Sequence, residues 1–449
     1  MKKREFLALA AASTLLLATL CGCSTGDSGE AAKPQENEVE YKVIDQHFAP
    51  WSRGLEFTEN INGTLSVSGI GNCRDSEIII PLHGRDGRIV TGIADGAFKN
   101  CESIESVTLQ DNVISIGAEA FSGCTSLEEI NLPDTLDRVE ERAFHDTAYY
   151  LNEENWEGRV LYIGKYLIKA KPLAGGEITV KDGTLLIADK AFLGNSFVKS
   201  LALPGSLTGI GERAFDSCRV LKKVNIPGSV KIIRRYAFNE CEALVDLTFE
   251  NGVQSIESHA FRYTAIQKVS LPESLKKINT YAFSECDSLD ELEMPSGGVL
   301  ISSDVFHRSK VWDDWYYRKA DALYIGKHLI DVNQEISGSF EVREDTVSIA
   351  GYAFSHCENL TAVTIHDNVE IIGYNAFHNC PGLTEIYIGN GVKSIEIYAF
   401  WNCYNLKDIY YAGTKAEWAA IEKGENWDSS LKGYTVRCID GDLYDTLGK

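Results

Sequence analysis

The dipeptide Ala-Phe returns along this chain at a nearly fixed interval, and this regularity limits the possible fold more than any other feature. Neighbouring copies lie about 23 residues apart, except across two gaps that are roughly twice as long. Such self-similarity is typical of a solenoid, whose coils bury their apolar faces against one another. Twelve phenylalanines in register predict a continuous spine of rings: Phe98, Phe121, Phe144, Phe192, Phe215, Phe238, Phe261, Phe283, Phe306 (after Val305), Phe354, Phe377 and Phe400.

Each repeat ends in a short segment in which apolar and polar residues alternate. The letters LEEINLP at residues 127–133 show the pattern, which recurs as LALP at 201–204 and VNIP at 224–227. Alternation predicts a strand with one buried face, and the proline ends that strand because it lacks a ladder N–H. Few windows show the period of an amphipathic helix. We therefore predict a β-rich repeat solenoid of about 23-residue coils, with N-terminal and C-terminal caps.

Cysteine recurs three residues after the repeat phenylalanine. The other four repeats carry Thr147, Asn195, Thr264 and Ser309 there, so every occupant is small and has a side chain that forms hydrogen bonds. This substitution pattern predicts a buried ladder that satisfies backbone groups, with reduced thiols. It does not fit a zinc site, which needs clustered CxxC-type ligands. The ladder cysteines are Cys101, Cys124, Cys218, Cys241, Cys286, Cys357, Cys380 and Cys403; disulfides at Cys73 and Cys438, outside the ladder, stay open.

The N-terminus has the pattern of a bacterial lipoprotein signal peptide. Three basic residues precede an apolar run, and the tetrapeptide LCGC follows at residues 20–23. This ending resembles a lipobox, and the resemblance implies removal of residues 1–22 and attachment of a diacylglyceryl group to Cys23. Two acyl chains suffice for stable anchoring. Residues 23–40 lack aromatic side chains and are predicted to be a disordered tether.

The remaining chain divides into two caps and an array. Residues 41–95 are expected to form an N-terminal cap with a degenerate repeat, residues 96–409 the solenoid, and residues 410–449 a C-terminal cap with a short helix. Two divergent segments, near 144–191 and 306–353, share the letters LYIGK, which stand at 161–165 in the first and at 323–327 in the second. We interpret each as one divergent coil that arose by block duplication. Twelve phenylalanine repeats and these two predict roughly fourteen coils.

The repeat pattern AFxxCxxLxxIxLP resembles the BspA-like leucine-rich repeats of bacterial surface proteins, over roughly residues 51–438. The letters YYAGTKAEW at residues 410–418 resemble the terminal segment common in that family. The resemblance implies a solenoid on the cell envelope that binds host or microbial ligands. It transfers no catalytic residue to this chain.

Charge and motif content narrow the function further. The net charge of −22 opposes binding to nucleic acid and docking of a polybasic patch on a membrane. No HExxH, GxSxG, P-loop or EF-hand pattern occurs in the sequence, so we expect no catalytic residue, metal or cofactor, and no enzyme.

The last coils carry aromatic residues at exposed positions, whereas earlier coils place Lys, Glu or Ser there. Tyrosine and tryptophan are enriched at binding hot spots, which makes Tyr387, Trp401, Tyr404 and Tyr410 candidates for ligand binding. The competing interpretation is that these rings pack beneath the C-terminal cap. The sequence thus favours a lipid-anchored, extracytoplasmic protein of the bacterial envelope that captures a surface protein or glycan. A structural spacer of the envelope is the alternative.

Overall fold

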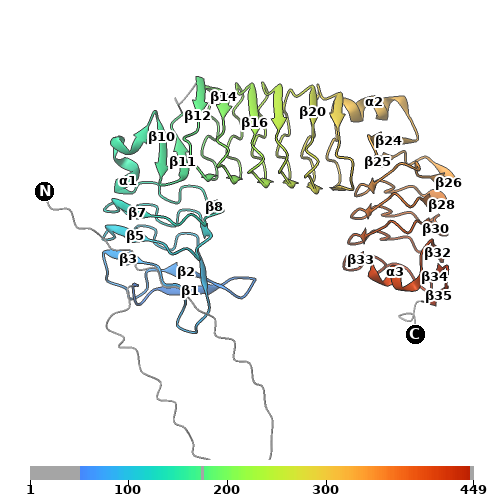
Figure 1. Ribbon diagram of the computed structural model, residues 1–449, viewed down its shortest axis with the longest axis horizontal. Helices are drawn as coiled ribbons and strands as arrows, with labels where there is room; N and C mark the ends of the chain where they lie inside the picture. The colour runs from blue at the N-terminus through green and yellow to red at the C-terminus, as the bar shows by residue number, and fades with distance from the viewer. Residues whose placement is uncertain (1–50, 173–175, 445–449) are drawn as a thin grey trace, which may run out of the picture. The chain divides into compact units, whose positions relative to one another are not determined.

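A computed structural model describes residues 51–172 and 176–444, which form a solenoid of short strands and tight turns (Figure 1). The predicted signal peptide, Cys23 and tether lie outside the described residues. Two ladders of parallel strands run through the coils, one of short and one of longer strands. The fold class predicted from the repeat is confirmed, because one coil stacks on the next at the spacing of the Ala-Phe pairs throughout these residues.

The short ladder contributes one strand to every coil. Its strands are β2 (Leu65–Gly69), β4 (Val90–Ile93), β6 (Ser115–Ile116), β8 (Arg138–Val139), β11 (Tyr166–Ala170), β13 (Leu186–Ile187), β15 (Gly209–Ile210), β17 (Ile232–Ile233), β19 (Ser255–Ile256), β21 (Lys277–Ile278), β23 (Leu300–Ile301), β25 (His328–Val332), β27 (Ser348–Ile349), β29 (Ile371–Ile372), β31 (Ser394–Ile395) and β33 (Glu422–Lys423). These sixteen strands correspond to sixteen coils. The expected fourteen was too low, because the coils of β2 and β33 lack the phenylalanine used for counting.

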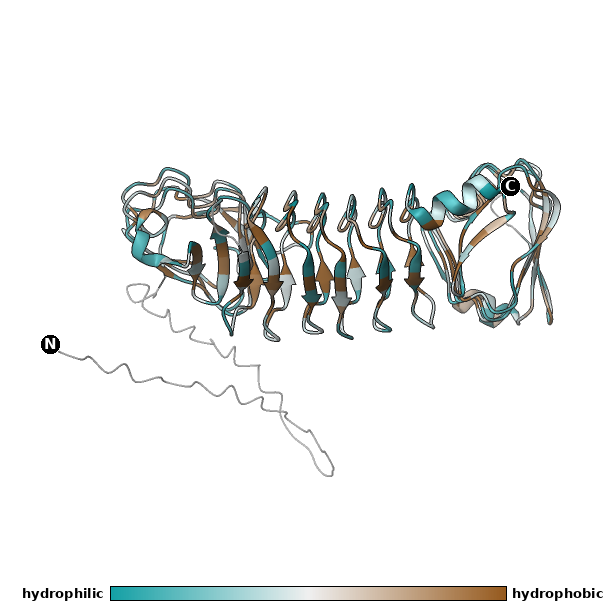
Figure 2. Ribbon diagram, turned by 90° about the horizontal axis from the view of Figure 1, so that it is seen from above, coloured by the Kyte–Doolittle hydropathy of each residue, from teal (hydrophilic) through white to brown (hydrophobic). Residues whose placement is uncertain are grey.

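The long ladder lies on the other side of each coil and is divided into four sheets. Its strands are β3 (Glu77–Ile79), β5 (Ser106–Thr108), β7 (Glu129–Asn131), β12 (Gly176–Thr179), β14 (Val198–Ala202), β16 (Lys223–Ile226), β18 (Asp246–Phe249), β20 (Lys268–Ser270), β22 (Glu291–Glu293), β26 (Ser337–Glu341), β28 (Asn359–Ile365), β30 (Glu385–Ile388), β32 (Asp408–Tyr411) and β34 (Thr435–Cys438). Apolar strand residues recur from coil to coil (Figure 2).

The Ala-Phe pair forms the turn that closes each coil. Around Phe215 the turn has two left-handed residues, Arg213 at φ 55° and Ser217 at φ 59°. Ala214 is fully buried, so a larger side chain has no room there. The N–H of Phe215 donates to the carbonyl of Ala237 at 2.8 Å, which joins the turn to the next coil. Left-handed backbone costs energy in non-glycine residues, and the stacked hydrogen bonds offset that cost.

The phenylalanine rings form three separate stacks, so the predicted continuous spine is wrong. Ring centroids within a stack lie between 4.6 and 6.1 Å apart. Among the described residues, no ring contact joins Phe144 to Phe192 or Phe306 to Phe354. The stacks contain Phe98–Phe144, Phe192–Phe306 and Phe354–Phe400.

An antiparallel hairpin fills each gap between stacks. In the first, β10 (Val160–Ile163) pairs with β11, and in the second, β24 (Ala322–Ile325) pairs with β25. The first hairpin is buried on both faces, since Leu161 packs in the core of Phe144 while Tyr162 packs in the core of Phe192. Strands β11 and β25 also continue the short ladder. Each divergent segment is therefore a coil, as expected, but it also divides the hydrophobic core.

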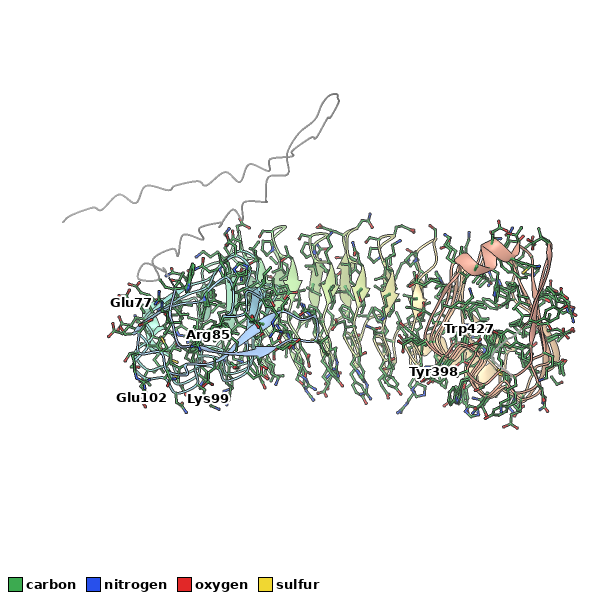
Figure 3. The ribbon with its side chains drawn as sticks, turned by 90° about the horizontal axis from the view of Figure 1, so that it is seen from below. Glu77, Arg85, Lys99, Glu102, Tyr398 and Trp427 are labelled. Atoms are coloured by element: carbon green, nitrogen blue, oxygen red, sulfur yellow. The ribbon has the colours of Figure 1, made fainter. Side chains whose placement is uncertain are left out.

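Short helices, the strand β9 beside the first hairpin and two terminal strands complete the fold. They are α1 (Ala148–Leu151), the 3-10 helix η2 (Glu153–Asn155), β9 (Trp156–Glu157), α2 (Lys310–Arg318), α3 (Lys415–Ala420), β1 (Glu56–Glu59) and β35 (Gly441–Tyr444). The helix expected after Thr414 is present as α3, begins with a capping box of Thr414 and Glu417, and buries Trp418. Trp427, labelled in Figure 3, packs on Phe400 at 6.0 Å and ends the last ring stack. No helix among the described residues is long and apolar enough to cross a membrane.

Candidate functional site

The predicted cysteine ladder corresponds to a row of thiol hydrogen bonds in the core. Most of these thiols donate to the carbonyl of the phenylalanine one coil earlier, as Cys124 does to Phe98 at 3.0 Å. In coils without cysteine, the hydroxyl of Thr147 or Thr264 donates to the phenylalanine carbonyl of its own coil at 2.9 Å. The position therefore satisfies a buried carbonyl whichever of these residues occupies it.

Burial makes these thiols poor nucleophiles and poor metal ligands. It raises the pKa of Cys124 and of Cys218 to about 12, so both remain protonated at neutral pH. All ten cysteines in the described ranges, Cys73 and Cys438 included, are free in the structure. Among the same residues, no group of three or more His, Cys, Asp or Glu side chains is placed to hold a metal ion. The ladder thiols thus contribute hydrogen bonds to the core, and the aromatic candidates for ligand binding lie elsewhere.

Tyr387 and Tyr410 lie side by side on the outer face of the long ladder. They occupy β30 and β32 in direct register, with ring centroids 4.5 Å apart and planes 8° from parallel. Tyr387 is 40 % exposed. The guanidinium of Arg437, one strand further along, lies 5.9 Å from the centroid of the Tyr410 ring. A hollow of about 460 Å³ adjoins the pair and is also lined by His366 and Asp367.

Aromatic rings occupy this column of the long ladder only at Tyr387 and Tyr410 among the described strands. The equivalent residues elsewhere are small, polar or aliphatic: Ile79, Thr108, Asn131, Thr179, Ala202, Asn225, Thr248, Ser270, Glu293, Glu341 and Thr364. The ring that packs against the cap is the next residue, Tyr411, which is 3 % exposed and lies 5.2 Å from Trp418. The tyrosine pair thus lies apart from the contact of Tyr411 with Trp418, although Arg437 of the C-terminal cap lies over the Tyr410 ring.

Trp401 and Tyr404 do not join this pair. Both lie on the turn between β31 and β32, where Trp401 contacts the ring of Tyr398 at 4.9 Å. The Tyr404 hydroxyl donates to the side chain of Asn402. The four aromatic candidates therefore form two patches, one on the strand face and one on the turns.

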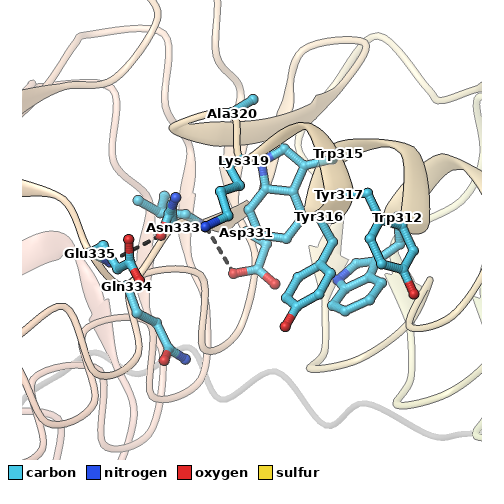
Figure 4. Close-up of a pocket in the computed structure, with 11 residues that line it drawn as sticks. Trp312, Trp315, Tyr316, Tyr317, Lys319, Ala320, Asp331, Asn333, Gln334 and Glu335 are labelled. Carbon is cyan, nitrogen blue, oxygen red and sulfur yellow. Dashed lines mark hydrogen bonds between the residues drawn. The ribbon is translucent and has the colours of Figure 1, made fainter.

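A second aromatic site lies at the second hairpin, beside α2 (Figure 4). The pocket has a volume of about 510 Å³ and is walled by Trp312, Trp315, Tyr316 and Tyr317. Trp312 and Tyr316 stack at 4.8 Å, and Tyr317 is 78 % exposed. The indole Nε1 of Trp315 is buried without a hydrogen-bond partner, which costs stability. The sequence favours the last coils for a ligand site, and the aromatic loops at Trp156 and Trp312 come second.

Asp331 lies on the opposite side of this pocket, in β25. Its carboxylate accepts the backbone N–H of Val332 at 2.8 Å. Burial raises the pKa of Asp331 to about 7, although the hydrogen bonds of Val332 and Trp312 oppose the rise. In the described ranges, no Lys, Arg or His side chain forms an ion pair with this carboxylate. The aromatic pocket therefore contains a half-buried acid that forms no ion pair within the described ranges, although Lys319 also lies on the pocket wall.

Comparison with known proteins identifies the repeat. The model for the BspA-type leucine-rich repeat region, six copies long, matches residues 91–219, 185–312 and 333–422. A leucine-rich repeat protein from Bacteroides ovatus is 21 % identical over 86 % of this chain and 98 % of its own, with a TM-score of 0.31. A leucine-rich cell surface protein from Faecalibacterium prausnitzii is 21 % identical over 83 % and 98 %, with a TM-score of 0.25.

The leucine-rich repeat protein of T. pallidum is 24 % identical over 53 % of this chain and 88 % of its own, with a TM-score of 0.25. Curated protein sequences gave no match. The matched family segments cover more than half of the chain and include its Ala-Phe turns and thiol ladder. On this evidence the chain belongs to the BspA-type leucine-rich repeat family.

Proposed function

We propose that this protein is a non-enzymatic binding protein of the bacterial cell envelope, anchored through a diacylglyceryl group on Cys23. It captures a host or microbial surface protein or glycan. The family often occurs in surface proteins, which supports the location. The lipobox-like sequence before Cys23 supports the anchor.

One observation carries the binding role: the stack of Tyr387, which is exposed, on Tyr410, which is half-buried. Folding does not require aromatic rings in this column, because the other coils form the same ladder without them. Exposed tyrosines also lower solubility unless a partner covers them. Tyrosine supplies a large, rigid contact area with a hydroxyl that forms hydrogen bonds, which suits protein and sugar surfaces alike.

The alternative is a spacer that holds other envelope components at a distance, and the middle coils favour it. Their exposed strand residues pair with one another, as Lys223 does with Asp246 at 2.7 Å and Lys268 with Glu291 at 3.1 Å. Exposed, mutually paired charges offer little to a partner. A spacer would need only such a face over its whole length, so the tyrosine stack distinguishes the two functions.

The test is a glycan array combined with pull-down from host and bacterial surface proteins, comparing wild type with the double variant Tyr387→Ser, Tyr410→Ser. We expect the double variant to lose the captured ligand while its melting temperature stays nearly unchanged. Tyr263→Ser is the matched control, because Tyr263 is also 40 % exposed but lies on a turn in a middle coil. Equal capture by all three proteins would exclude the tyrosine pair as the binding site. If the wild type captures nothing specifically, the spacer function is favoured.

A further inference from the structure

The two hairpin segments are structural duplicates that differ in charge at one half-buried position. Asp331 of β25 corresponds to Lys169 of β11, because each occupies the same register of its hairpin. Asn333 corresponds in the same way to Lys171. A smaller hollow of about 160 Å³ lies beside Lys169 and Lys171 in the first segment. The pocket at Asp331 and the hollow at Lys169 therefore occupy equivalent positions beside the two hairpins, and their residues have diverged.

In the first copy, a lysine of the chain itself lies over the aromatic ring beside the hollow. The ammonium of Lys171 lies 4.5 Å from the ring centroid of Trp156 and pairs with Glu153. The ammonium of Lys169 donates to the carbonyl of Lys190 at 2.7 Å. A cation over an indole face is a favourable arrangement, and here the chain itself supplies it.

The second copy keeps the aromatic wall and reverses the charge. Both lysines are absent, a carboxylate stands in place of one of them, and four rings surround a larger volume. From this geometry we propose that the pocket of Trp312, Tyr316 and Asp331 binds an alkylammonium group supplied by a ligand. The rings would contact the cation by cation–π interaction, and Asp331 would neutralise its charge. This site does not depend on the tyrosine pair or on the anchor at Cys23.

The charged groups around Asp331 set the pH dependence. Asp304 adds a repulsive charge, and Cys357, whose own pKa burial raises, stays neutral. Lys319 and Glu335 also line the pocket and are exposed. Because burial raises the pKa of Asp331 to about 7, its charge develops between pH 6 and 8. Affinity for an alkylammonium ion should therefore rise across this interval.

The experiment titrates three probes into the full chain at pH 8 and follows tryptophan fluorescence and calorimetric heat. Choline represents a free or headgroup cation, and Nα-acetyl-lysine methylamide represents a lysine side chain. The third probe, 3,3-dimethylbutan-1-ol, has the shape of choline without its charge. We expect at least one cation to bind about tenfold or more tightly than the neutral alcohol. The cation that binds better identifies the source of the group.

Three variants complete the test. Asp331→Asn keeps the shape of the side chain and should weaken cation binding about tenfold or more without changing binding of the alcohol. Asp313→Asn is the control, because it removes the same charge from α2 outside the pocket. Lys319→Met removes a competing ammonium from the pocket wall and should tighten binding. The proposal is wrong if the alcohol binds as well as choline, or if Asp331→Asn leaves cation affinity unchanged in a folded protein.

Discussion

The backbone N–H of Asp189 donates to the carbonyl of Val139 at 2.9 Å, although a complete hairpin lies between them in the sequence. The preceding residue, Ala188, bonds instead to Leu167 of that hairpin at 2.8 Å. One strand end therefore contacts both the inserted hairpin and the coil before it. The same pair of bonds recurs at the second hairpin, from Gly351 to Ile301 and from Ala350 to Leu329, each at 2.8 Å. Each hairpin thus separates the two flanking coils on one side only, and on the other side the coils bond to each other directly.

Phenylalanine stacking should stabilise the middle of the array more than its start. Phe238 has a ring partner on each side, Phe215 and Phe261, whereas Phe98 has one stacking partner, Phe121, in the described part of the chain. Phe238→Ala should lower the free energy of unfolding by about 3–5 kcal/mol. Phe98→Ala should cost less, because fewer coils depend on it in a nearest-neighbour stack. Urea unfolding measures both, and equal losses would contradict the nearest-neighbour description.

The ladder cysteines should be free thiols in the native protein. Their sulfurs bond to backbone carbonyls, as those of Cys124 and Cys380 do to phenylalanine, which is a different geometry from a disulfide. Thiol counting in denaturant without reductant should find at least six of the eight; three or more bridges among them would refute the prediction. Cys380→Thr should be tolerated better than Cys380→Leu, because only threonine keeps a small hydrogen-bonding side chain at this buried position.

Asp331 should destabilise the protein above neutral pH. Its pKa is raised by burial to about 7 from 3.8, so between these values the folded state binds more protons than the unfolded state. Stability from this group is then fully present below about pH 4 and is lost as pH rises through about 7. Asp331→Asn should raise the melting temperature at pH 8 and change it little at pH 4. If the variant and the wild type differ in melting temperature by the same amount at pH 4 and at pH 8, Asp331 does not titrate in this range.

Cys23 should be the first residue of the mature protein. Mass spectrometry of the native N-terminus should find an acylated cysteine there, because the apolar run and the lipobox-like tetrapeptide are contiguous. Cys23→Ala should release or mislocalise the protein, whereas Cys21→Ala should leave the anchor intact as a control. An unmodified N-terminus at another residue would exclude this anchor.

The sequence alone determined the solenoid and its interior. The Ala-Phe period and the alternating segments specify the coil because each depends on local geometry: a tight turn with a buried alanine, and a strand with one apolar face. The residue types three positions after phenylalanine also predicted a hydrogen-bonding ladder. Such features repeat from coil to coil, so the repeat pattern is sufficient to predict the coil and its buried ladder.

Only the tertiary structure decided what interrupts the repetition. The letters LYIGK at residues 161–165 did not indicate a hairpin buried on both faces, because continuous apolar runs fit several elements equally well. The phenylalanine spine is divided because these buried hairpins lie between its three stacks, and the local pattern did not reveal them. Likewise Tyr387 and Tyr410 form a pair while Trp401 and Tyr404 lie on turns, and Asp331 faces rings from α2. These relations join residues distant in sequence, and stacking of the coils, not local pattern, brings them together.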